Sequence, residues 1–165
     1  HAQHVPSFHL YIIFGIEREL EKELNHPFQD PRLLHYSQSF LAGIGINRSA
    51  DEGKKMWLNI RQDKIDIIVS ENKKLLMMNS FTWQTNEDVL YFTLFVCEQL
   101  ELNPEKLFLS VTGEIETGSV LYQLLNKYIK HVTIPENPSS LSFAIASDDV
   151  PFHHYTMLYN LALCE

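Results

Sequence analysis

The segment MWLNIRQDKIDIIVSENKKLLMMNSF, which runs from Met56 to Phe81, contains three apolar runs separated by two polar turns. The first turn, Arg61–Lys64, and the second, Glu71–Lys74, are short and charged. Each run is rich in the β-branched and large apolar residues that favour strands. Three strands joined by short turns are predicted to form an antiparallel meander. The predicted strands are Met56–Ile60, Ile65–Val69 and Leu75–Phe81.

The residues after this meander predict two helices that alternate with two short strands. Thr85 followed by Asp88 is a capping-box-like helix start. The helix behind it, Val89–Leu100, is apolar nearly all round, so we expect it to be sandwiched rather than laid on a surface. Residues 121–129 show the i, i+3, i+4, i+7 spacing of an amphipathic helix. The predicted strands are Leu107–Val111, which exits at Thr112-Gly113, and Val132–Ile134.

The residues before the meander predict a smaller group of elements. A strand at His9–Phe14, buried on both faces, precedes an amphipathic helix at Ile16–Leu24 and a second strand near Leu33–Ser37. The polar segment Ile46–Lys55 lacks hydrophobic periodicity and is the predicted boundary between the two groups. Near the C-terminus a final helix is predicted to start around Asp148.

The composition is that of a globular protein. The 165 residues are 45% hydrophobic and 21% charged, and the formal net charge is −8. This charge argues against a general nucleic-acid binder, because neutralising phosphates needs a clustered positive surface. Cys97 and Cys164 make no disulfide framework, and no apolar segment reaches the roughly 20 residues of a membrane helix. We therefore expect a cytoplasmic protein that has no membrane span and binds no nucleic acid.

The sequence lacks the common catalytic motifs. It contains no Cys-x-x-Cys, Gly-x-Ser-x-Gly or Gly-x-x-x-x-Gly-Lys segment. His153 and His154 are neighbours that would point about 100° apart on a helix, whereas paired metal ligands favour i, i+4 spacing. Glu114 and Glu116 fall in a predicted loop, where acids are mostly solvated. No metal site is therefore predicted.

Several segments are more distinctive than the order of elements. They are Lys74–Phe81, Thr85–Phe92, Glu98–Leu102, Thr112–Ile115, Leu121-Tyr122 and Lys127–Ile129. Together with the β-β-β-α-β-α-β order of residues 56–134, they resemble an uncharacterised Bacteroides-type family of unknown function, whose fold is a two-lobed, actin-like ATPase fold.

The resemblance implies an α/β protein in two parts. Residues 47–165 would form a ribonuclease-H-like β-β-β-α-β-α-β lobe of an actin-like ATPase fold, with a C-terminal docking helix. Residues 1–46 would form the C-terminal part of a first, incomplete lobe that precedes it. A hairpin of that first lobe is then expected upstream of His1.

Actin-like ATPases hold the nucleotide between their lobes, and each lobe supplies a hairpin whose Asp-x-Gly turn lets the backbone approach the phosphates. The equivalent turn here, Arg61–Lys64, has no glycine, and its Asp63 is not followed by x-Gly. The Thr112-Gly113 turn keeps one glycine where the ATPases usually have two. These departures predict that ATP is not hydrolysed, so no catalytic residue and no cofactor is assigned.

Two functions of different classes remain open. The first is a non-catalytic scaffold or protein-interaction module with an unknown protein partner. The alternative is a nucleotide-binding or weakly hydrolysing protein, in which ATP and Mg²⁺ would be held by Arg61, Lys64, Thr112 and Gly113. An unrelated enzyme is a third and less specific alternative.

Overall fold

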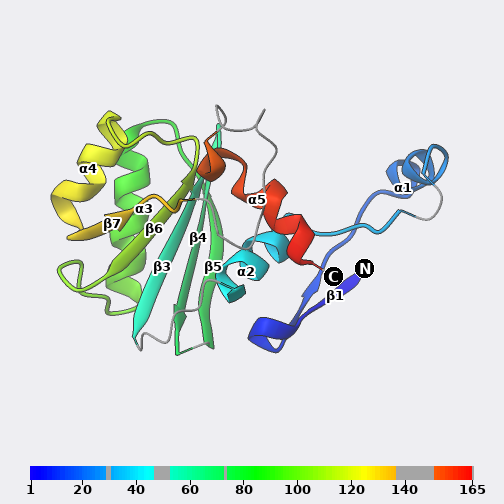
Figure 1. Cartoon of the computed structure of the whole chain (residues 1–165), viewed down its shortest axis with the longest axis horizontal. Coiled ribbons are helices and arrows are strands. Elements are labelled where there is room, and N and C mark those ends of the chain that lie inside the picture. The colour runs from blue at the N-terminus through cyan, green and yellow to red at the C-terminus, as the bar shows by residue number, and fades with distance from the viewer. Residues whose placement is uncertain (29–30, 47–52, 73, 137–150, 165) are drawn as a thin grey trace. The chain divides into compact units, whose positions relative to one another are not determined.

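The computed structural model describes residues 1–28, 31–46, 53–72, 74–136 and 151–164 (Figure 1). The chain divides into two units, residues 1–49 with 157–165 and residues 50–156. The boundary predicted between residues 46 and 47 adjoins positions 47–52, which lie outside the described residues. The segment from Met157 onward groups with the first unit, in place of the second lobe predicted from the sequence.

The second unit is built on a five-stranded sheet with the order β5-β4-β3-β6-β7. Strands β3, β4 and β5 are antiparallel neighbours, whereas β6 pairs in parallel with β3 and β7 in parallel with β6. Helix α3 (Asn86–Gln99) lies between β5 and β6 in the chain, and α4 (Val120–Tyr128) between β6 and β7. The predicted β-β-β-α-β-α-β order and fold class are therefore confirmed. The strands are β3 (Lys54–Ile60), β4 (Lys64–Glu71), β5 (Lys74–Thr82), β6 (Phe108–Gly113) and β7 (His131–Thr133).

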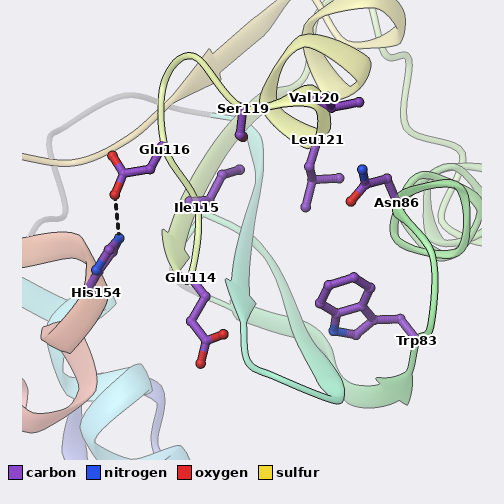
Figure 2. Close-up of a pocket in the computed structure, with 9 residues that line it drawn as sticks. All are labelled: Trp83, Asn86, Glu114, Ile115, Glu116, Ser119, Val120, Leu121 and His154. Atoms are coloured by element: carbon purple, nitrogen blue, oxygen red, sulfur yellow. Dashed lines mark ion pairs between the residues drawn. The ribbon is translucent and has the colours of Figure 1, made fainter.

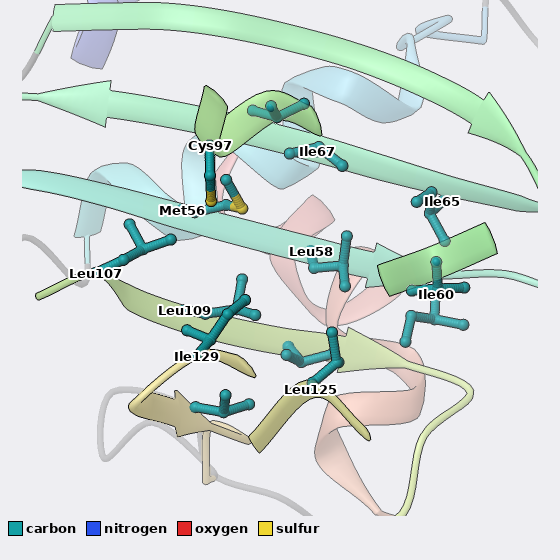
Figure 3. Close-up of a cluster of buried hydrophobic side chains, with 14 of the residues drawn as sticks. Met56, Leu58, Ile60, Ile65, Ile67, Cys97, Leu107, Leu109, Leu125 and Ile129 are labelled. Atoms are coloured by element: carbon teal, nitrogen blue, oxygen red, sulfur yellow. The ribbon is translucent and has the colours of Figure 1, made fainter. Parts of the chain in front are cut away.

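The apolar core of this unit lies between the sheet and helices α3 and α4 (Figure 3). Because side chains alternate between the two faces of a strand, every second residue of β3 and β4 faces these helices. Full burial of one large aliphatic side chain stabilises the folded state by about 1.5–3 kcal/mol. The strand residues of the core include Met56, Leu58, Ile60, Ile65, Ile67 and Val69, and the helix residues include Val89, Val96, Cys97, Leu121 and Leu125.

Helix α3 is covered on one side only, so the expectation of a sandwiched helix is wrong. Its buried residues, which include Val89, Thr93 and Val96, recur at the four- and three-residue spacing of a single face. On another face, Tyr91 is 61% exposed and Phe95 is 39% exposed. The apolar composition of α3 therefore serves two purposes, since part of it fills the core and part of it faces solvent.

The start of α3 has the predicted capping box. The Asp88 amide donates to Thr85 Oγ1 at 3.3 Å, and the Thr85 amide donates to the Asp88 carboxylate at 2.9 Å. The Gln84 amide also donates to this carboxylate at 3.0 Å. These hydrogen bonds, led by the one from the Gln84 amide, lower the pKa of Asp88 below its usual value because they stabilise the ionised form. The short Asp side chain thus completes a cap usually made by Glu or Gln.

The two cysteines are buried free thiols. Burial raises the pKa of Cys97, on α3, to about 11, because desolvation disfavours the thiolate. Burial also raises the pKa of Cys164, and the nearby positive charge of Arg32 opposes that shift. A thiol with a raised pKa is a weak nucleophile at neutral pH, so Cys97 acts as a small core residue.

In the first unit, β1 (Ala2–Val5) and β2 (Leu10–Ile13) form a two-stranded antiparallel sheet. The strand predicted at His9–Phe14 is present as β2. The prediction that β2 is buried on both faces is wrong, because Tyr11 is 67% exposed and Ile13 is 82% exposed. In the part of the chain that the structure describes, this hairpin pairs with no further strand, so it lacks the neighbours that bury a central strand. The helix predicted at Ile16–Leu24 is present as α1 (Arg18–Asn25).

The prediction of a second strand in the first unit, at Leu33–Ser37, is also wrong. Helix α2 (Tyr36–Ile46) begins inside that range. Phe40, Leu41 and Ile44 are all buried and lie at helical spacing. The requirement to bury these three side chains on one side favours a helix that extends over the polar residues before them.

The C-terminal residues form three short helical turns in place of one continuous helix. These are η3 (Phe152–Tyr155), α5 (Thr156–Tyr159) and η4 (Asn160–Leu163), and η4 packs against α2. The predicted helix start near Asp148 lies outside the described residues. Throughout the described ranges, no helix combines the length and the apolar character that crossing a membrane requires.

Gly113, the last residue of β6, meets the end of β3 too closely for any side chain. Its φ is +88°, and a Cβ atom there would lie 2.0 Å from the carbonyl oxygen of Ile60. We predict that Gly113→Ala lowers the free energy of unfolding by roughly 3 kcal/mol, because it combines a left-handed backbone with a backbone clash. Urea unfolding followed by circular dichroism measures this change.

Gly118→Ala is the matched control for this substitution. A Cβ atom at Gly118 has nothing within 4 Å, and its φ lies outside the left-handed range. Its effect on the free energy of unfolding is therefore expected to stay below about 1 kcal/mol. Equal stability of the two variants would show that β6 does not end against β3 as described.

Candidate functional site

The turn between β3 and β4, Arg61–Lys64, is closed by hydrogen bonds within the second unit. The Arg61 amide donates to the Lys64 carbonyl at 2.8 Å, and the Trp83 amide donates to the Asp63 carbonyl at 3.2 Å. The indole Nε1 of Trp83 donates to the Arg61 carbonyl at 2.9 Å. No residue of this turn has a positive φ. The turn therefore lacks the alternating left-handed geometry with which backbone amides form an anion-binding nest.

Asp66, on β4 just beyond the turn, is the centre of a polar network. Its side chain is fully buried, and its Oδ1 accepts a hydrogen bond from Arg61 Nη2 at 2.9 Å. Asn59 Nδ2 donates to Oδ2 at 3.3 Å, and the Ser80 hydroxyl donates to Oδ1. A buried carboxylate needs such partners, because an unpaired charge away from water is costly. The guanidinium of Arg61 is thus held by an internal anion.

The network continues from Asn59 to β6. Thr112 Oγ1 donates to Asn59 Oδ1 at 3.3 Å and lies 3.4 Å from the Leu58 carbonyl. Arg61 and Thr112, which lie on different strands, are therefore linked through Asp66 and Asn59. These hydrogen bonds join β3, β4 and β6, so the network stabilises one arrangement of the three strands.

The structure brings the four residues proposed for nucleotide binding to the same end of the sheet but gives them different surroundings. Thr112 is 5% exposed, and Gly113 lies against the Ile60 carbonyl. Arg61 is paired with Asp66, whereas Lys64 is exposed at the start of β4. Three of the four therefore have a structural role that accounts for their position without a ligand.

A hollow of about 300 Å³ opens beside this end of the sheet (Figure 2). It is bounded by the segment between β6 and α4, by the first residues of α4 and by the start of α3. In α/β proteins, ligands commonly bind beyond the carboxyl ends of parallel strands, which is where β6 ends. The lining residues are Trp83, Asn86, Glu114, Ile115, Glu116, Ser119, Val120, Leu121 and His154.

Two histidines of η3 approach the segment between β6 and α4. Nε2 of His153 lies 2.7 Å from the carbonyl oxygen of Ile115, and Nε2 of His154 lies 2.9 Å from Oε1 of Glu116. The two imidazole rings are 4.6 Å apart and nearly perpendicular, with an angle of 85°. The structure thus places two imidazoles and a carboxylate at one side of the hollow.

Sequence reasoning did not find this cluster. Glu116 precedes His153 and His154 by more than thirty positions. The two histidines are adjacent, which is not the i, i+4 spacing of paired metal ligands. The adjacent histidines were the only signal in the sequence. Their contact with Glu116 depends on η3 packing against the end of β6, which no local pattern predicts.

Comparison with known families matches residues 1–132 to the family described as "Protein of unknown function (DUF3822)". No protein with curated annotation matches the chain. The resemblance found from the sequence segments is confirmed by the family match and by a solved structure.

That structure is a Bacteroides thetaiotaomicron VPI-5482 protein described as having an actin-like ATPase fold and unknown function. It is similar to this chain with a TM-score of 0.78 and 28% sequence identity. The similarity covers 100% of this chain and 58% of the other, so this chain spans little more than half of the length of its structural neighbour.

The ion pair of Arg61 and Asp66 is testable by a double-mutant cycle. We predict that Arg61→Ala and Asp66→Ala each destabilise the protein and that their effects are not additive. The expected coupling free energy is about 1–2 kcal/mol, because a hydrogen bond to a buried charge is stronger than a neutral one, while Arg61 remains partly solvated. Urea unfolding of the wild type, the two single variants and the double variant measures it.

Lys64→Ala serves as the control, because Lys64 is an exposed residue of the same turn. Its effect on stability is expected to lie within about 0.5 kcal/mol of zero. A coupling free energy near zero between Arg61 and Asp66 would contradict the network described above.

Proposed function

The chain belongs to the DUF3822 family of proteins of unknown function, and we propose that it is a non-catalytic module on an actin-like fold that acts by binding a protein partner. The proposal is separate from the fold, because one fold hosts many functions and function depends on the residues of the site. We also propose that the protein is cytoplasmic. The two buried free thiols support this, because the cytosol keeps thiols reduced.

The observation that carries the proposal is the state of the Arg61–Lys64 turn. A phosphate loop needs free backbone amides, and it commonly uses glycine to allow a close approach. Here the Arg61 amide is bonded to the Lys64 carbonyl, and the Arg61 guanidinium is bonded to the Asp66 carboxylate. A phosphate at this turn would compete with a buried carboxylate for its cation, which disfavours nucleotide binding.

The remaining glycine of the proposed nucleotide site supports the same function. Gly113 is needed because its backbone touches the Ile60 carbonyl, and the Glu114 amide donates to that same carbonyl at 2.9 Å. This packing accounts for the glycine without an adenosine beside it.

The surface that we propose for the partner is the α3 aromatic face, defined as Tyr91 and Phe95. Their rings are 6.1 Å apart and nearly parallel at 19°, and both are exposed. Exposed aromatic side chains are typical anchors of protein interfaces, because they bury a large area at a small entropic cost. The exposed Glu87 and Glu98 of α3 favour a partner with a basic rim around an apolar pocket.

Nucleotide binding separates the two functions. We predict that ATP with Mg²⁺, up to millimolar concentration, leaves the melting temperature of the protein unchanged, because a ligand stabilises only the folded state that it binds. Differential scanning fluorimetry measures the shift. A rise of several degrees that Arg61→Ala and Lys64→Ala remove would support the nucleotide-binding alternative. Gly113 variants are unsuitable for this test because their expected destabilisation would itself lower the melting temperature.

Partner binding is tested by crosslinking the wild type and its variants to the proteins that they bind in cell extract and comparing the captured proteins. We predict that proteins captured by the wild type from the source cells are lost when Tyr91→Ser and Phe95→Ser are combined. Truncating two aromatic anchors should weaken binding by about 2 kcal/mol or more. Tyr128→Ser is the control, because Tyr128 is a 44% exposed aromatic residue on α4. Capture that is equal for all three proteins would rule out the α3 aromatic face as the binding surface.

A further inference from the structure

Glu116, His153 and His154 form a cluster suited to a metal ion. Each offers one ligand atom, and the three atoms lie within 4.8 Å of one another. All three residues belong to the second unit, and Figure 2 shows His154 and Glu116 facing each other at the edge of the hollow. We propose that this cluster binds a first-row transition-metal dication such as Zn²⁺.

The approach of His154 to Glu116 fits two ligands of one ion. Zinc bonds to nitrogen and to carboxylate oxygen are about 2.0–2.2 Å long, so neighbouring ligand atoms on one ion are about 3 to 3.5 Å apart. The observed separation of Nε2 and Oε1 is 2.9 Å. Although this contact is close, it does not have hydrogen-bond geometry, and the buried Nε2 atom has no hydrogen-bond partner among the described residues. A metal ion beside both atoms would satisfy them together.

His153 makes the kind of hydrogen bond that metal-ligating histidines commonly make. Its Nε2 lies 2.7 Å from the Ile115 carbonyl oxygen, and a carbonyl oxygen can only accept. Nε2 therefore carries the hydrogen, and in the neutral ring Nδ1 has the free lone pair. Ligating histidines usually donate their second nitrogen to a carbonyl or carboxylate in this way, which fixes the ring and raises its basicity.

The ligand types select the class of metal. Two imidazoles and one carboxylate suit zinc and other first-row transition ions, whereas Ca²⁺ and Mg²⁺ prefer oxygen ligands alone. The single carboxylate charge of Glu116 partly offsets a dication, and the exposed Glu114 on the wall of the same hollow adds a second negative charge nearby. Glu116 is 62% exposed, so its carboxylate has room to adjust to the ion at little cost.

Three protein ligands leave one position of a tetrahedral zinc ion for water or another oxygen donor. Because Glu116 and His154 both line the hollow, this position would lie at its edge. The ion would also connect η3 to the segment between β6 and α4, which are held together by the His153 contact to Ile115. The site is separate from the α3 aromatic face, so it does not depend on the proposed function.

Binding of Zn²⁺ alone to the tag-free protein tests the proposal. Isothermal titration calorimetry of protein stripped with a chelator is expected to show one high-affinity zinc equivalent per chain. Glu116→Gln and His154→Gln should each weaken that binding at least about tenfold, as loss of a ligand does. Co²⁺ should give visible absorption bands in the wild type that both variants lose.

His131→Gln is the matched control, because His131 is a histidine of the same unit that stacks on Phe108, away from the cluster. It should bind zinc like the wild type. Glu116→Gln keeps the test valid if a histidine variant fails to fold, since Glu116 is a largely exposed side chain. The absence of high-affinity binding, or equal affinity in the cluster variants and in His131→Gln, would overturn the proposal.

Discussion

The parallel pairing of β6 with β3 is the constraint on which the second unit depends. The pairing ends where the backbone of Gly113 meets the Ile60 carbonyl. The two lie so close that a Cβ atom at position 113 would clash with the carbonyl oxygen. The same carbonyl accepts the Glu114 amide, so the direction in which the chain leaves β6 is fixed. From that point the chain buries Ile115, presents Glu116 at the surface and enters α4 with Ser119 as its cap.

At the same end of the sheet, the β3–β4 turn contains no glycine and no residue with a positive φ. The charged and polar side chains beside this turn are hydrogen-bonded to one another. Asp66 holds Arg61, and Asn59 joins Asp66 to Thr112. A network of this kind stabilises a unique arrangement. The proposed partner surface and the proposed metal cluster use none of these network residues.

Most of the architecture of the second unit could be predicted from its sequence. The three-strand meander, the capped start of α3 at Thr85, the amphipathic α4 and the order of elements all follow from local periodicity and turn chemistry. The absence of glycine from the Arg61–Lys64 turn was likewise visible. In the first unit, local patterns were less reliable, because the exposure of β2 and the helix at Tyr36 depend on which neighbours are present.

In the second unit, the sequence by itself determined which strands and helices form and that the Arg61–Lys64 turn has no glycine, because these properties depend on neighbours within a few positions. Only the tertiary structure decided that α3 exposes Tyr91, that Asp66 captures Arg61, and that Glu116 meets His154. The physical reason is that each of these outcomes depends on contacts between elements. Side-chain burial and charge pairing are settled when strands and helices pack, and residues far apart in the chain then share one environment.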